Sequence, residues 1–176
     1  GFLPTTVRTI GAAEQCHLRW VKQPAAGVRE RNSFEIVFDL GFTDGKLTAL
    51  TIPESYFGFV SKDVVIAAIK SLGGANVDQK QRRALGSVIL GSDAWPTQKL
   101  LTALLGVPTE QHVEGGRVTS RYLCQPTAPD GKGKELDIRL VFDPTTEMLL
   151  QMTARLPFGR VDLKFDPPAA TPPPTP

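Results

Sequence analysis

The sequence predicts an α+β fold in which two helix-plus-antiparallel-meander repeats form one continuous antiparallel sheet with helices on one face. Two observations lead to this prediction. Segments of the first third of the 176-residue chain return in the last third, so that RWVKQPAAG, FEIVFD and LTIP correspond to RYLCQPTAPDG, IRLVFD and ARLP. In addition, several segments alternate apolar and polar residues as strands do, and others repeat apolar residues at helical spacing.

The internal repeat keeps the order of its matches. Aligning Arg19-Trp20 with Arg121-Tyr122 also places Gln23-Pro24 on Gln125-Pro126. With two more residues in the hairpin loop of the second copy, Phe38-Asp39 falls on Phe142-Asp143. We therefore expect a first repeat over 3–60, a helical linker over 61–92, a second repeat over 93–166 and a proline-rich tail over 167–176 that joins neither helix nor sheet.

Helices are expected at three places and a weak helical turn at a fourth. In the second copy, Pro96 suits the first turn of a helix and Gly106 ends it, with an apolar stripe formed by Leu100, Leu101, Leu104 and Leu105. In the first copy, residues 5–11 allow only a short or degenerate helix. The linker reads as a helix over DVVIAAIKSL, a stop at Gly73-Gly74, and a second helix over VDQKQRRALGSVIL.

Strands follow each predicted helix, because the apolar period changes to two. One face of the first alternating strand carries Phe34, Ile36, Phe38 and Leu40, and one face of its counterpart carries Leu136, Ile138, Leu140 and Phe142. Hairpins then lead to LTALTI and LLQMTARL. A fourth strand is predicted over 160–165, and less clearly over YFGFV in the first copy.

Composition bounds the function classes. A net charge of +2, from 20 basic and 18 acidic residues, gives no electrostatic reason to expect a nucleic-acid or anionic-membrane partner. No apolar run approaches the roughly 20 residues of a transmembrane helix. The first residue is glycine, which fits a processed chain, and a lipid anchor ahead of residue 1 stays open. For Cys16 and Cys124, one disulfide and two packed reduced thiols both stay open.

Residues for chemistry are sparse. Nucleophilic catalysis needs a histidine close to a serine or cysteine, and His17 and His112 stand in no recognisable motif. The scattered histidines and cysteines lack the close ligand pairs of a zinc site. Gly73 and Gly74 end a helix rather than open one after a strand, so they do not indicate a phosphate loop. We expect no enzyme, no metal and no cofactor.

The second copy resembles a known family. Its short helix, LLGVPTE segment, aromatic strand and strand ending in Phe-Asp are similar to those of SmpA/OmlA (BamE-like) bacterial outer-membrane lipoproteins. The residues that carry this resemblance are Thr97, Leu104, Leu105, Gly106, Pro108, Tyr122, Phe142 and Asp143. The tandem arrangement is also similar to the beta-lactamase-inhibitor-protein fold. The resemblance implies an extracytoplasmic setting (periplasm, outer-membrane-associated or secreted) and protein binding.

A partner-binding surface is expected on the open face of the sheet. Aromatic and arginine side chains favour binding hot spots, and the candidates here are Trp20, Tyr56, Tyr122, Arg139 and Arg160. The competing interpretation is that Trp20 and Tyr122 are buried beneath the helices. The leading hypothesis is a non-enzymatic envelope scaffold or assembly factor that binds another protein. The alternatives are an inhibitor of a secreted or periplasmic hydrolase and a carrier of a small apolar ligand.

Overall fold

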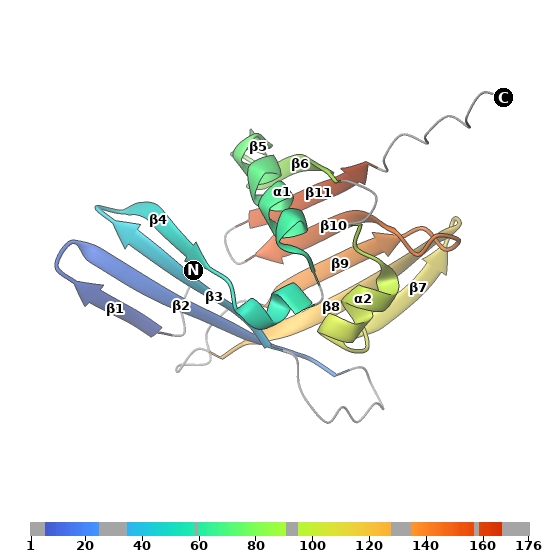
Figure 1. Cartoon of the computed structure of the whole chain (residues 1–176), viewed down its shortest axis with the longest axis horizontal. Helices are drawn as coiled ribbons and strands as arrows, with labels where there is room; N and C mark the ends of the chain where they lie inside the picture. The colour runs from blue at the N-terminus through green and yellow to red at the C-terminus, as the bar shows by residue number, and fades with distance from the viewer. Residues whose placement is uncertain are drawn as a thin grey trace.

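One large sheet dominates the computed structural model, which describes residues 6–24, 35–58, 60–90, 95–127, 135–156 and 159–166 (Figure 1). The predicted tail over 167–176 lies outside the described residues. The order of the strands along the sheet is β4-β3-β2-β8-β9-β10-β11-β6-β5, with β1 paired to β2 and β7 paired to β8. The strands are β1 (Thr6–Ile10), β2 (Ala13–Lys22), β3 (Glu35–Thr43), β4 (Lys46–Thr51), β5 (Asn76–Asp78), β6 (Arg83–Ile89), β7 (Glu110–Glu114), β8 (Arg117–Pro126), β9 (Leu136–Phe142), β10 (Leu149–Leu156) and β11 (Gly159–Asp166).

The predicted fold class is wrong. Of the described residues, 58% are in strands and 18% in helices, and the 11 strands form one mixed sheet instead of two helix-plus-meander repeats. The sheet is mixed because β6 and β11 pair in parallel, whereas the other paired strands are antiparallel.

Two segments predicted as helix form strands. In the linker, Gly86, Val88 and Leu90 are buried while the residues between them are exposed, so the true period over this segment is two. In the first copy, all of residues 6–10 except Arg8 are β-branched, and they form β1. The turn after β1 uses Gly11, whose φ of 61° favours glycine. The segment YFGFV, predicted as a strand, lies mostly in the 3-10 helix η1 (Glu54–Gly58).

The remaining predicted elements are confirmed. Helix α1 (Lys62–Gly73) is capped by Ser61, and helix α2 (Gln98–Leu105) is capped by Thr97, whose hydroxyl accepts from the Leu100 amide at 3.3 Å. Both alternating strands, both hairpin partners and the strand over 160–165 are present. Both helices lie on the same face of the sheet (Figure 1).

The repeat survives as two strand groups with one register. In the first strand group (β1–β4) Trp20 lies opposite Ile36, and in the second strand group (β7–β10) Tyr122 lies opposite Ile138. The pair formed by Cys16 and Leu40 in the first group likewise corresponds to the pair formed by Val118 and Phe142 in the second. The predicted equivalence of Phe38 and Phe142 is therefore wrong, because no two-residue shift occurs between the paired strands.

The core lies between the sheet and the helices. A larger cluster joins Val64 of α1 and Leu101 and Leu105 of α2 to strand residues that include Tyr122 and Phe142. A smaller cluster surrounds Trp20 and includes Leu18, Ile36, Cys124 and Leu136. Because these residues share one face of the sheet, the opposite face is left to polar side chains.

Candidate functional site

The two aromatic residues predicted for the binding face are buried on the helix side. The exposed fraction is 4% for Trp20 and 1% for Tyr122. The Tyr122 hydroxyl donates to the carbonyl oxygen of Gly106, at the end of α2, at 3.3 Å. These two residues therefore belong to the core, as in the competing interpretation, because the apolar face of each long strand is the one that the helices cover.

Tyr56 contacts the backbone of the chain itself. It comes from η1 and is half-buried. Its hydroxyl donates to the carbonyl oxygen of Glu35 at 2.7 Å and accepts from the amide of Val37 at 2.9 Å. These backbone groups lie on β3 beyond the residues that pair with β4. The Tyr56 hydroxyl therefore satisfies two backbone hydrogen-bonding groups at this edge of the strand. Burial raises the pKa of Tyr56.

Arg139 and Arg160 lie on the opposite, polar face, together with residues that the sequence did not single out. The strand register places Arg121, Arg139, Thr153 and Asp162 in one row across β8 to β11. The adjacent row contains Asp137, Arg155, Arg160 and Arg83 across β9, β10, β11 and β6. We call this surface the arginine face and define its cations as Arg83, Arg121, Arg139, Arg155, Arg160 and Lys164.

Asp137 organises one end of the arginine face. Its carboxylate accepts two hydrogen bonds from Arg121, at 3.1 and 3.2 Å, and one from Arg139 at 3.4 Å. Only 8% of Asp137 is exposed. Burial by itself raises the pKa of Asp137, but the hydrogen bonds from the two arginines outweigh it and lower the pKa below its ordinary value. Asp137 therefore holds both guanidinium groups in place as an ionised carboxylate.

Asp162 organises the other end of the arginine face. It is fully buried and accepts from Arg160 at 2.7 and 2.9 Å, from Arg83 at 2.7 Å and from the Thr153 hydroxyl at 2.7 Å. Burial raises its pKa, and these donors reverse the effect and lower it. The side chains of Arg83 and Arg160 remain 40% and 37% exposed. Each guanidinium is thus fixed on one side and open to solvent on the other.

The arginine face carries an excess of positive charge. Its two rows contain five arginines and three carboxylates, those of Glu110, Asp137 and Asp162, and Lys164 lies in the next row along β11. Arg155 and Lys164 are exposed. The Nε of Arg139 is buried and has no hydrogen-bond partner among the described residues. Rigid, half-exposed guanidinium groups are suited to bind carboxylates of another molecule.

Alternation in the sequence could have revealed part of this face. It separates Asp137 and Arg139 from the apolar residues of their strand. The contact between Arg83 and Asp162 forms because β6 pairs with β11. The alternation of residues within each strand does not predict that pairing.

The described residues provide little for catalysis. His17 Nδ1 lies 2.7 Å from the Asp39 carboxylate on the surface, and His112 is largely exposed. Cys16 and Cys124 are both free and buried. Burial raises the pKa of Cys124 to about 12, which keeps its thiol protonated and poorly nucleophilic. Within the described ranges, no three His, Cys, Asp or Glu side chains are grouped so as to hold a metal ion.

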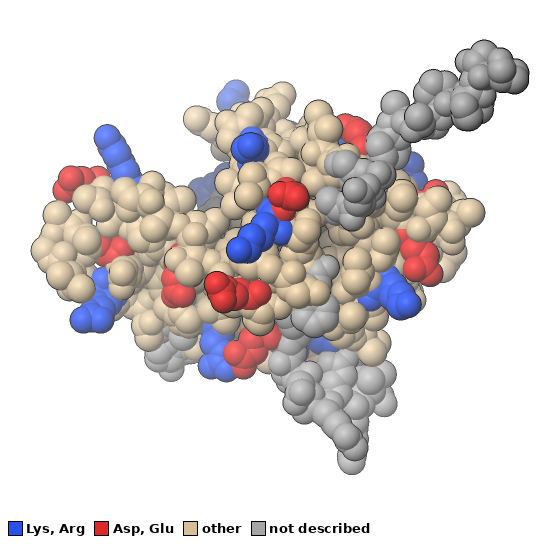
Figure 2. Space-filling view, viewed as in Figure 1, with Lys and Arg blue, Asp and Glu red and all other residues tan. Residues whose placement is uncertain are grey.

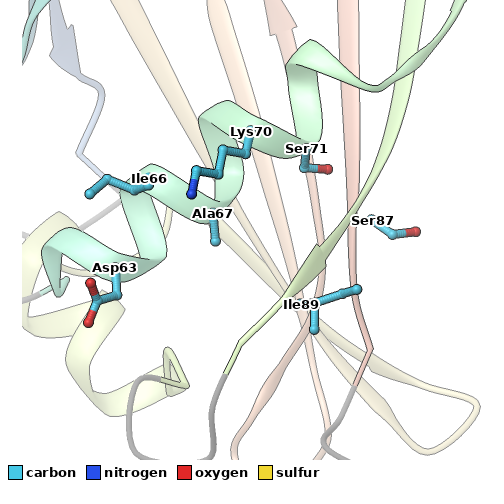
Figure 3. A pocket seen from close by; sticks show the side chains of 7 residues that line it. All are labelled: Asp63, Ile66, Ala67, Lys70, Ser71, Ser87 and Ile89. Carbon is cyan, nitrogen blue, oxygen red and sulfur yellow. The ribbon is translucent and has the colours of Figure 1, made fainter.

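A shallow groove lies on the helix side, between α1 and β6 (Figure 3). Its volume is about 480 Å³, and it is open to solvent. Asp63, Ile66, Ala67, Lys70 and Ser71 line it from α1, and Ser87 and Ile89 line it from β6. An open groove of this kind does not enclose an apolar ligand as a carrier would.

The helix side as a whole shows no concentration of one charge. Acidic and basic side chains are scattered there among uncharged residues (Figure 2). No helix in the described part of the chain is long and apolar enough to span a membrane. Comparison of the chain with protein-family models, with curated proteins and with solved structures finds no match.

Proposed function

We propose that the protein is a non-enzymatic binding module whose arginine face recognises an acidic surface of another protein. The observation that carries this proposal is the ordered array of guanidinium groups around Asp137 and Asp162, with more positive than negative charge and no described helix over it. Arginine is enriched at binding hot spots, and a pre-fixed guanidinium loses less entropy when it binds.

The setting of this function is part of the proposal. The resemblance of the second copy to SmpA/OmlA lipoproteins supports an extracytoplasmic location and a role as an envelope scaffold or assembly factor. An acidic partner surface fits either an assembly partner or a hydrolase, so the identity of the captured protein would separate the assembly role from the inhibitor role.

The test is affinity capture from native envelope and secreted fractions. The informative variant is Arg155→Glu/Lys164→Glu, because both side chains are exposed and neither donates any of the described hydrogen bonds that Asp137 and Asp162 accept. The matched control is Lys46→Glu/Lys99→Glu, which makes the same charge change at exposed positions on β4 and α2. We expect one acidic protein to be captured by wild type and by the control, to be lost with the face variant, and to be released by salt. A captured set that is identical for all three proteins would refute the proposal.

A further inference from the structure

A second surface of the molecule is apolar, and none of the helices in the described part of the chain lies on it (Figure 1). Strands β1 and β4, together with residues 13–17 of β2 and 39–43 of β3, form a four-stranded extension that we call the flap. In Figure 1 the flap extends from the body at the left, beyond α1 and α2. Its β1 and β4 residues are all exposed.

The strand register defines an apolar patch on the flap. One row across the four strands contains Val7, Cys16, Leu40 and Leu50, and the next contains Leu47 opposite Phe42. The exposed fractions are 48% for Val7, 56% for Leu47 and 42% for Leu50. The patch lies on the same side of β2 as Trp20 and Leu18 and continues the smaller core cluster outward. Uncharged residues cover most of the flap in the view of Figure 2.

The second strand group shows what covers the equivalent surface. Leu40 corresponds to Phe142, and Leu50 and Leu149 are their respective partners on the next strand. Phe142 and Leu149 are 1% and 2% exposed, in the same cluster as Leu101 and Leu105 of α2. The segment before α2 is also tied to β10, because the Trp95 indole donates to the carbonyl oxygen of Leu149 at 2.9 Å. Within one molecule, this kind of surface is thus seen to accept a short amphipathic helix.

We propose that the flap is a docking surface for an amphipathic helix of a partner protein, seated as α2 is seated on the second strand group. The helix presents leucine-like residues at positions i and i+4, as Leu101 and Leu105 do in α2. Glu14 lies opposite Phe42 on the same side of the flap and is exposed, so a lysine or arginine beside the apolar stripe complements it. This surface is separate from the arginine face and does not depend on it.

The test uses a defined probe. A peptide of residues 95–109, WPTQKLLTALLGVPT, is made helical by a hydrocarbon staple between positions 99 and 103, both exposed in α2. Its control carries Leu101→Glu and Leu105→Glu. Fluorescence anisotropy gives the dissociation constant, and ¹⁵N-¹H NMR of the whole chain shows which amides move.

The flap variant is Leu47→Glu/Leu50→Glu, and Val7→Glu is a second one on another strand. All three positions are exposed, so the fold is expected to persist. The matched control is Ile10→Glu, since Ile10 is 58% exposed on the opposite side of the same flap. We expect shifts confined to β1–β4, binding weakened at least about tenfold by either flap variant, and no change with Ile10→Glu.

Three results would overturn the proposal. One is equal binding of the peptide and its control, or no binding of either. Another is shifts confined to β8–β10, which would mean that the peptide competes with α2. The third is a dimer of the chain in light scattering that either flap variant dissociates and Ile10→Glu does not, which would assign the patch to a second copy.

Discussion

At the scale of single residues, the open face is organised by two carboxylates that water barely reaches. Asp137 and Asp162 lie in adjacent rows, and each binds one arginine of its own strand and one of a neighbouring strand. An unpartnered buried carboxylate is costly, so these aspartates depend on the arginines as much as the arginines are positioned by them. The order of the arginine face and the stability of the sheet therefore depend on the same contacts.

Lowering the pH should reveal how far the stability of the protein depends on the contacts of these two aspartates. The pKa of each aspartate is lower in the folded chain than its ordinary value of 3.8. A lowered pKa contributes stability that is complete above the unfolded value and is lost as the pH falls through the folded value. We expect the free energy of unfolding to fall below about pH 4, and Asp162→Asn to lower it by about 2 kcal/mol at pH 7 with a shallower acid dependence.

Urea denaturation followed by circular dichroism between pH 2 and pH 7 measures this effect. The control is Asp166→Asn, at the exposed end of the same strand, and it should behave as wild type. An acid dependence of Asp162→Asn equal to that of wild type would show that Asp162 is not the titrating group.

At the scale of elements, the contact between α1 and β6 depends on one glycine. A Cβ built on Gly86 would lie 2.4 Å from the Ser71 hydroxyl oxygen and 3.0 Å from the Ser71 carbonyl oxygen. The backbone of α1 thus approaches β6 as closely as glycine permits. We expect Gly86→Ala to push α1 away from the sheet and to destabilise the protein by about 1–3 kcal/mol.

Thermal unfolding of Gly86→Ala checks this prediction, with Gly58→Ala as the comparison, because a Cβ at Gly58 meets nothing within 4 Å. A crystal structure or NOE contacts would show whether α1 has moved. Equal melting temperatures for the two variants would mean that α1 tolerates the extra methyl group at no cost.

A comparison of β9 with β6 shows where prediction from the sequence succeeds and where it fails. The alternation over 136–142 is unbroken, so that strand was predictable, as were its face of apolar residues and the separation of Asp137 and Arg139 from them. Over 77–90 the sequence reads as a helix with a polar first half, and the buried positions are explained only by the pairing of β6 with β11. Tertiary pairing overrides local propensity there. The candidate site was predictable to the extent of Arg139 and Arg160. Arg121 and Arg83 were not, because they contact Asp137 and Asp162 from other strands, and only the pairing of the strands brings them there.

At the scale of the whole molecule, the sheet is stabilised unevenly. Strands β8 to β11 have neighbours on both sides and bury residues such as Tyr122, Leu140 and Leu163 under the helices. The flap has exposed outer strands and no described helix over it. The fold is therefore a mostly β body, in which helices cover one face of a single mixed sheet, with a thinner extension. The repeated sequence alone did not predict this division, because it gave both halves a helix.

This unevenness predicts the order of local opening. Elements with few buried contacts open with free energies well below that of global unfolding. We expect amides of β1 and β4 to exchange with deuterium at opening free energies at least about 2 kcal/mol below those of β9 and β10. Hydrogen exchange read by NMR measures both sets in one sample. Uniform protection would show that the flap is already as stable as the body, whereas selective protection of β1 and β4 by the stapled peptide would show that a bound helix supplies the layer that α2 supplies elsewhere.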